Sequence, residues 1–446
     1  MLMTDLLITG GCLISDGQKQ QADILIQKGR IERIDPSISA PAQAKVIDAQ
    51  GQWVLPGLID DQVHFREPGL THKASIATEA KAAVAGGVTT FFEMPNVSPP
   101  TLDMARLEEK REIARRDSVA NYAFFLGASN DNMEAVKSAD PTKIAGVKVF
   151  MGSSTGNMLV DEEKVLEQIF RHAPTPIATH CEDTPTILEN EQAARAKYGE
   201  KVPFSQHPLI RSREACLTSS TLAVELARKE DARLHVLHIS TEEELDLFTP
   251  GDPRITAEAC VHHMWFEESS YASLGSQIKC NPAIKKDSDR QAIRQAVADG
   301  RISVLATDHA PHTWEEKQGT YFSAPSGLPL VQHTLLLMLE MVKQKDFSLE
   351  TLVERACHAP ARIFDVIDRG YLREGYWADI VLVNPNEETV VDQNELFSKC
   401  GWSPFAGETF SHRIERTIVS GKTAYQKGQV DDNCRGLAVE FAKVRR

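Results

Sequence analysis

Residues 54–66 read VLPGLIDDQVHFR, in which an apolar run, 54–64, ends in polar side chains. Short apolar runs bounded by turn residues are typical of buried strands. Seven further runs of this kind follow, at 88–94, 119–126, 144–150, 176–180, 234–239, 255–261 and 302–308. Between them lie segments with a helical spacing of apolar residues, such as 74–85, 102–116, 161–171 and 208–230. Eight strand–helix units in succession predict a (β/α)8 TIM barrel of the α/β class rather than a doubly wound sheet.

Both ends of the chain differ from this middle. Short strands are predicted at 5–9, 22–27, 30–34 and 45–48, and again at 379–383, 389–392, 413–420 and 422–425. Since both ends predict β structure, we expect them to join in one small β-sandwich domain made from residues 1–53 and 379–446. The barrel is then expected to span residues 54–378.

The charge of the chain limits its partners. Its 446 residues include 49 Lys plus Arg and 63 Asp plus Glu, a formal net charge of −14. This balance argues against a nucleic-acid partner and a basic membrane-binding face, but an anionic small-molecule substrate stays compatible with it. No apolar run approaches the roughly 18 residues of a membrane span, and no basic signal region is seen, so a cytoplasmic location is expected. The eight Cys form no CxxC pair and are expected to be reduced thiols.

Polar residues follow several of the predicted strands. Active sites of such barrels lie at the C-terminal ends of the strands. A single His there would most simply be a core or surface residue, whereas several imidazoles with a carboxylate have the composition of a Zn²⁺ site. The first strand contributes two side chains that face the same way, because they are two residues apart. The predicted metal ligands are Gln62, His64, Lys148, His180, His238 and Asp308.

Lys148 and Asp308 need separate interpretations. A free ammonium is a poor metal ligand, so Lys148 is either an ordinary salt-bridged lysine or, after CO₂ adds to it, a carbamate that bridges two metal ions. Asp308 is the best candidate for the catalytic general base, because it can accept a proton from a metal-bound water whose pKa falls toward about 7 on Zn²⁺.

A second set of residues is suited to a substrate carboxylate. Arg66 lies two residues after His64 and faces the same way, and its planar fork matches a carboxylate. Asn96 and His312 could complete this grip. Asn281 follows the seventh run and could add a polar contact, although a turn residue before Pro282 is the simpler interpretation.

Three further histidines are not expected to be ligands. His262 and His263 both follow the seventh run and are interpreted as residues around the site or at the surface, since neighbours on a strand do not face one point. His235 lies three residues before His238, so it points to the other face of the strand, where core packing is expected.

At these residues the chain resembles the amidohydrolase superfamily and, within it, the dihydroorotases of the cyclic-amidohydrolase group. The resemblance covers nearly the whole chain, and the segments that carry it are PGLID at 56–60, VHFREPG at 63–69, EMPN at 93–96, GVKVFM at 146–151, THCE at 179–182, LHIST at 237–241 and ATDHAPH at 306–312. It implies metal ligation by His64, Lys148, His180, His238 and Asp308. It also implies that Arg66, Asn96 and His312 bind the substrate carboxylate, with Asn281 nearby.

One departure from the family pattern concerns the number of metal ions. The family usually has His-x-His at the end of the first strand, and this chain has Gln62-Val63-His64. An amide oxygen is a weaker zinc ligand than imidazole, so either one or two Zn²⁺ ions per chain are compatible with the sequence.

The resemblance implies an activity with two alternatives. A dihydroorotase interconverts (S)-dihydroorotate and N-carbamoyl-L-aspartate in de novo pyrimidine (UMP) synthesis: zinc-bound hydroxide attacks the ring amide and Asp308 passes the proton to the leaving nitrogen. A homo-oligomer is expected. One alternative is an allantoinase- or hydantoinase-type cyclic amidase, against which the Asn96 carboxylate contact argues. The other is a non-catalytic dihydroorotase-like partner of aspartate transcarbamoylase, which Gln62 favours and the remaining ligand set disfavours.

Overall fold

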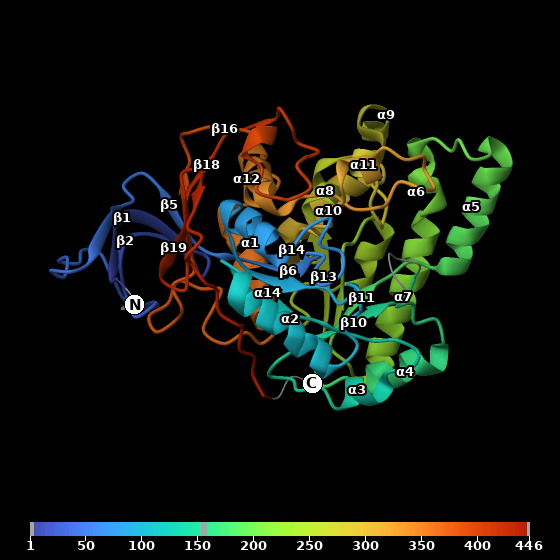
Figure 1. Ribbon diagram of the computed structural model, residues 1–446, viewed down its shortest axis with the longest axis horizontal. Coiled ribbons are helices and arrows are strands. Elements are labelled where there is room, and N and C mark those ends of the chain that lie inside the picture. The colour runs from blue at the N-terminus through green and yellow to red at the C-terminus, as the bar shows by residue number, and fades with distance from the viewer. Residues whose placement is uncertain (1–3, 153–157, 444–446) are drawn as a thin grey trace.

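The computed structural model describes residues 4–152 and 158–443, so the outermost residues of the predicted β domain, 1–3 and 444–446, lie outside it. Its middle part is a barrel of parallel strands surrounded by helices (Figure 1). The strands are β6 (Leu58–Val63), β7 (Val88–Glu93), β8 (Asn121–Phe124), β9 (Leu126–Gly127), β10 (Val147–Phe150), β11 (Ile177–His180), β12 (Leu234–Val236), β13 (Ile255–Cys260) and β14 (Val304–Ala306). Each of the eight predicted runs contains one of these strands, and β9 continues β8 after one intervening residue.

The strands pair in chain order and close on themselves. β6, β7 and β8 form one parallel set, and β9 to β14 form another. Between β14 and β6 the main-chain N–H of His64 donates to the carbonyl of His309 at 2.7 Å. The predicted (β/α)8 barrel is therefore confirmed, and its strand ends meet on one face.

Several helices begin at a side chain that caps their first turn. Ser75 caps α1 in this way, and Ser212 caps α7. The cap at Ser212 divides the predicted helical segment 208–230 into α6 and α7. The helices are α1 (Ile76–Ala85), α2 (Met104–Asp117), α3 (Met133–Lys137), α4 (Glu163–His172), α5 (Thr184–Tyr198), α6 (His207–Ile210), α7 (Arg213–Glu230), α8 (Val261–Trp265), α9 (Tyr271–Leu274), α10 (Asp287–Asp299), α11 (Trp314–Lys317), α12 (Thr334–Gln344), α13 (Leu349–Val353) and α14 (Ala359–Ile363).

Strands from both ends of the chain join in one nine-stranded sheet, seen as adjacent blue and red strands in Figure 1. Its order is β20 (Gln429–Val430), β19 (Lys422–Gln426), β18 (Arg413–Val419), β15 (Ile380–Asn384), β5 (Trp53–Pro56), β1 (Leu6–Ser15), β2 (Gln18–Gln27) and β3 (Arg30–Asp35), with β4 (Lys45–Asp48) also on β1. The sheet curls around its own apolar core, which includes Ile8, Ile24 and Ile380. Both termini thus build one β unit, as the sequence predicts.

The first predicted run, 54–64, is two strands that belong to different sheets. β5 pairs with β1 and β15 of the terminal sheet, whereas β6 pairs with β7 of the barrel. Gly57 separates them, and a Cβ there would lie 2.1 Å from Oγ1 of Thr89. The predicted boundary between residues 53 and 54 therefore falls inside β5.

Two stretches of the C-terminal part leave the terminal sheet to contact the barrel. One lies between β15 and β18 and contains the short strands β16 (Thr389–Val390) and β17 (Thr409–Phe410). The other follows β20, where Ala438 pairs with Tyr122 and Phe441 with Val366. In the part of the chain that the structure describes, the eight cysteines are free thiols, and no helix is long and apolar enough to cross a membrane.

Candidate active site

The C-terminal ends of the barrel strands surround one small cavity. Eight of the ten residues predicted from the sequence line it: Gln62, His64, Arg66, Lys148, His180, His238, Asn281 and Asp308. The other two bond to residues of this lining, because Asn96 contacts His64 and His312 contacts Arg66. The cavity measures about 30 Å³, room for a single water. Ser326 and Gly327 also line this cavity.

His64 and Asp308 form the first half of a candidate metal-ligand set. Nδ1 of His64 lies 2.8 Å from Oδ1 of Asn96, an acceptor, so this nitrogen carries the proton. Nε2 of His64 then turns its lone pair toward Oδ1 of Asp308, 3.0 Å away. Burial lowers the pKa of His64, which keeps the imidazole neutral. A lone pair and a carboxylate oxygen at this distance fit a cation bound between them.

Gln62, also predicted as a ligand, contacts Asp308 through its amide group. Its amide nitrogen donates to Oδ1 of Asp308 at 3.2 Å, and its amide oxygen faces the thiol of Cys260 at 3.8 Å. Gln62 thus supplies a hydrogen-bond donor to Asp308 where a histidine would supply a lone pair.

His180 and His238 form the second half. Nδ1 of His180 lies 2.9 Å from Nε2 of His238, while Nε2 of His180 lies 3.0 Å from the Glu182 carboxylate. Nδ1 of His238 has no hydrogen-bond partner among the described residues. Burial lowers the pKa of both imidazoles, so they are neutral as metal ligation requires. Glu182, itself ion-paired with Arg211, holds the ring of His180 in the way that carboxylates commonly support zinc-binding histidines.

Lys148 lines the same cavity as both halves and forms no ion pair with a described residue. It is 1% exposed, and within residues 4–152 and 158–443 its ammonium makes no hydrogen bond or ion pair. Its Nζ lies 4.6 Å from the ring centre of Phe150. Burial lowers the pKa of Lys148 to about 8, which increases the share of neutral amine, the form that adds CO₂. The ordinary salt-bridged lysine that the sequence left open is not what the structure contains.

The backbone at the site adopts an unusual conformation at three residues. Asp308, His238 and Arg66 have φ values of 49°, 40° and 69°, in the left-handed region that residues other than glycine rarely adopt. Such residues cost about 1–3 kcal/mol each and persist where the surroundings fix them, typically at functional sites.

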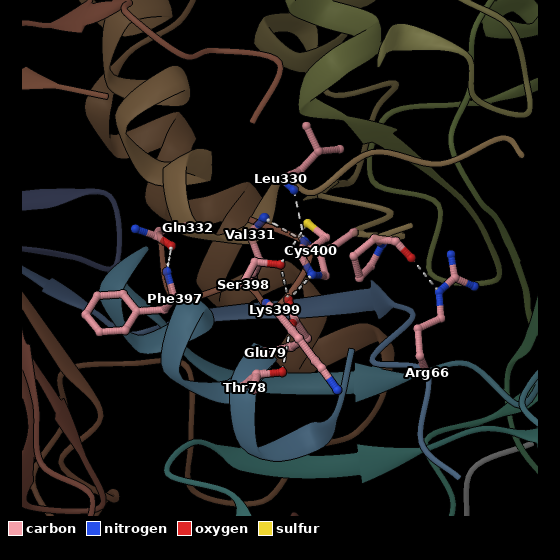
Figure 2. Close-up of polar contacts among 12 residues, drawn as sticks. Arg66, Thr78, Glu79, Leu330, Val331, Gln332, Phe397, Ser398, Lys399 and Cys400 are labelled. Atoms are coloured by element: carbon pink, nitrogen blue, oxygen red, sulfur yellow. Dashed lines mark hydrogen bonds and ion pairs between the residues drawn. The ribbon is translucent and has the colours of Figure 1, made fainter. Parts of the chain in front are cut away.

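Arg66, with the neutral His312 beside it, forms a cationic edge next to the candidate metal ligands. Nε of Arg66 donates to the carbonyl of Pro311 at 3.0 Å, and Nη2 lies 3.1 Å from Nε2 of His312 (Figure 2 shows the Arg66 contact). Burial and the neighbouring Arg66 and Lys73 hold the pKa of His312 well below its usual value. Lys317 is fully buried nearby and, among the described residues, donates to main-chain carbonyls, including those of Pro325 and Gly327. Despite the net charge of −14, this edge is locally positive.

The three histidines that were predicted not to be ligands, His235, His262 and His263, are all buried. His235 is buried as expected, but beside carboxylates: its Nε2 lies 3.2 Å from Asp61, and the carboxylates of Asp61 and Glu258, against the effect of burial, raise the pKa of His235 to about 9. The surface interpretation of His262 and His263 is wrong, because both are buried and their rings lie 4.1 Å apart. They stand in helix α8, which begins at Val261, so successive side chains are about 100° apart instead of on opposite faces.

The sequence of residues 53–424 matches the model of a known family, described as "Amidohydrolase family". The chain belongs to the amidohydrolase family. This amidohydrolase is 33% identical over 413 residues to a dihydroorotase from Halobacterium salinarum, an alignment that covers 90% of the chain and 95% of the relative. It is also 30% identical over 435 residues to an allantoinase from Bacillus velezensis, with 95% of the chain and 94% of the relative covered.

Solved structures agree on the fold of the amidohydrolase. The L-hydantoinase of Arthrobacter aurescens superposes with a TM-score of 0.93 over 98% of this chain and 100% of that one, at 24% identity. The family and the dihydroorotase relatives support a cyclic amide hydrolase, and the printed names of the relatives, dihydroorotase and allantoinase, differ in the substrate. A larger cavity of about 380 Å³, lined by Gln332, Val391 and Tyr425 among others, holds none of the predicted site residues.

Proposed function

We propose that this amidohydrolase is a zinc-dependent dihydroorotase, which interconverts (S)-dihydroorotate and N-carbamoyl-L-aspartate in pyrimidine synthesis. The observation that carries this proposal is Arg66 beside the metal-ligand set. Its guanidinium is oriented by Pro311 and by His312, and it lines the same cavity as His64 and Asp308. A group that binds carboxylates is useful to a dihydroorotase, whose substrate has a carboxylate on the ring, and much less so to an enzyme whose ring lacks one.

The metal would be held by two groups of side chains. Nδ1 of His180 and Nε2 of His238 offer one pair of donors, joined by Lys148 if it is carbamylated, and Nε2 of His64 with Asp308 offers the other. Zn²⁺ bound here would polarise the amide carbonyl and make water a stronger acid. Because Gln62 donates to Asp308, we expect one tightly held zinc, with the position beside His64 weakly filled.

The residues of the chain then have separate tasks. Asp308 accepts a proton from the attacking water and delivers it to the ring nitrogen that leaves. Arg66, His312 and Asn96 hold the carboxylate and so fix the ring before the reaction, and Asn281 faces the same cavity. Glu182 keeps His180 oriented throughout.

An allantoinase or hydantoinase activity is the second candidate, because the allantoinase from Bacillus velezensis is nearly as similar as the dihydroorotases. The test is the hydrolysis of (S)-dihydroorotate, allantoin and hydantoin by the purified, zinc-loaded chain, compared by kcat/KM. Preference for dihydroorotate by at least tenfold supports the proposal, and turnover of allantoin alone refutes it. Absence of any turnover, in a chain that binds zinc, would favour a non-catalytic role.

A further inference from the structure

Glu79, a buried carboxylate outside the cavity, bonds to His309 near one end of residues 308–312, the loop that contains Asp308. Glu79 of α1 is fully buried, and four donors surround it (Figure 2). Its Oε2 accepts from Nε2 of His309 at 2.8 Å and from the hydroxyl of Ser398 at 2.6 Å. Its Oε1 accepts from the main-chain N–H of Lys399 at 3.0 Å and from the hydroxyl of Thr78 at 2.8 Å. A buried carboxylate is costly unless it is bonded, and these four bonds use its acceptor positions fully.

The partners of His309 fix both its orientation and its tautomer. Nδ1 of His309 accepts from the main-chain N–H groups of Leu330 at 2.9 Å and Val331 at 3.2 Å. The proton of the ring is therefore on Nε2, where it is donated to Glu79. A ring held on both nitrogens in this way cannot rotate without breaking bonds on each side.

His309 is also the residue that follows Asp308. Its carbonyl accepts from the N–H of His64 at 2.7 Å, and its own N–H donates to Oγ1 of Thr307 at 2.9 Å. Asp308, in its left-handed conformation, is thus flanked by a residue that is anchored through both its main chain and its side chain. The bond from Glu79 therefore restrains Asp308 indirectly, through His309.

Two of the four bonds to Glu79 come from Ser398 and Lys399. Both belong to residues 397–402, a segment distant in sequence that lies between β15 and β18. This 397–402 segment has two further contacts near the site. The N–H of Phe397 donates to the side chain of Gln332 at 2.8 Å, and Nε1 of Trp402 donates to the carbonyl of His312 at 2.8 Å. The segment therefore touches both ends of the 308–312 loop, one through Glu79 and His309 and the other directly.

We propose that Glu79 is a positioning residue: together with the 397–402 segment it fixes His309, and thereby holds the Asp308 carboxylate beside Nε2 of His64, where it can accept the proton of the attacking water. The effect on kcat rests on the proposed function, whereas the effect on the position of the Asp308 carboxylate does not. The competing explanation is that Glu79 only stabilises the fold.

The experiment compares Glu79→Gln, Ser398→Ala and Ser398→Thr with the wild type. In Glu79→Gln, the amide N–H₂ faces hydrogen-bond donors that contact a carboxylate oxygen in the wild type. Ser398→Ala removes one of the four bonds to Glu79. Ser398→Thr keeps the hydroxyl that makes this bond. Asp23→Asn is the matched control, because Asp23 is a buried carboxylate that accepts two main-chain N–H bonds in the terminal sheet, far from the site. Each variant is assayed well below its Tm with the cyclic amide that the wild type hydrolyses best, and each is crystallised.

Positioning predicts that Glu79→Gln lowers kcat about 10- to 100-fold with KM changed less than about threefold, as for residues that support a metal ligand. Ser398→Ala should lose several-fold in kcat and Ser398→Thr should recover most of it, while Asp23→Asn lowers Tm alone. In the crystal the Asp308 carboxylate of Glu79→Gln should be displaced from Nε2 of His64. Unchanged kcat despite a lower Tm, or an Asp308 that has not moved, would overturn the inference.

Two complications leave the inference testable. If Glu79→Gln does not fold, the pair of Ser398 variants decides by the same comparison. If the wild type hydrolyses no cyclic amide, the proposed function fails, and the position of Asp308 in the variant crystals still decides whether Glu79 holds it.

Discussion

Replacement of Arg66 by Met tests whether the cationic edge of the cavity recognises a substrate carboxylate. The change removes the charge and the N–H groups of a residue that is 3% exposed, and leaves a side chain that still fills apolar space. In the wild type, Nε of Arg66 donates to Pro311 and one N–H of Nη2 faces His312, so the remaining N–H groups of the two terminal nitrogens are what it offers a ligand. Binding by both of them would give two charge-assisted hydrogen bonds.

The size of the effect follows from those two bonds. A hydrogen bond to a charged group is worth about 1.5–3 kcal/mol, so the pair is worth about 3–6 kcal/mol. Because about 1.4 kcal/mol corresponds to a factor of ten, kcat/KM for dihydroorotate should fall about 10²- to 10⁴-fold. The kcat/KM of Arg66→Lys for dihydroorotate should lie between those of the wild type and of Arg66→Met, because lysine keeps the positive charge but lacks the planar guanidinium.

The assay pairs dihydroorotate with dihydrouracil, the same ring without the carboxylate. Arg66→Met should lose its activity toward dihydroorotate and keep its activity toward dihydrouracil within about threefold. Dihydrouracil has no carboxylate, so the loss of the Arg66 hydrogen bonds does not affect its binding. Thermal unfolding and zinc content should be measured alongside. An equal loss on both substrates would refute the reasoning, since Arg66 would then act on the metal site or on the fold.

Three further substitutions test the metal-ligand set. Asp308→Asn should lower kcat about 10²- to 10⁴-fold with Tm nearly unchanged, because it removes the proton acceptor; retained activity would show that another group is the base. Gln62→His should raise the zinc content by about one ion per chain, measured by elemental analysis of the dialysed protein, since it restores an imidazole where the structure has an amide; an unchanged content would contradict the explanation offered for Gln62. Lys148→Met should lower both zinc content and turnover, and full retention of zinc would exclude Lys148 as a source of metal ligands.

The barrel and most of its site could be predicted from the sequence because their signals are local. Each strand is a short apolar run, and the polar residue that follows it marks the end that faces the cavity. His180 and His238 were placed together by this argument, and their nearest ring nitrogens lie 2.9 Å apart. The sequence also placed Arg66 on the same face as His64, and both line the cavity.

Features that depend on long-range packing gave no such signal. Both β5 and β6 are buried, so the run 54–64 looks continuous, and only strand pairing shows that Gly57 divides it. His263 was misplaced because the chain enters a helix directly after β13, where the spacing of side chains changes. Glu79 and Ser398 are 319 residues apart, and neither has a pattern that indicates the other.

The most direct test of the central claim is ring closure of N-carbamoyl-L-aspartate by the purified chain, followed with and without zinc. We predict that the zinc-loaded protein forms (S)-dihydroorotate, that a chelator abolishes the reaction and that added zinc restores it. A chain that binds zinc and opens allantoin, yet forms no dihydroorotate, would contradict the account.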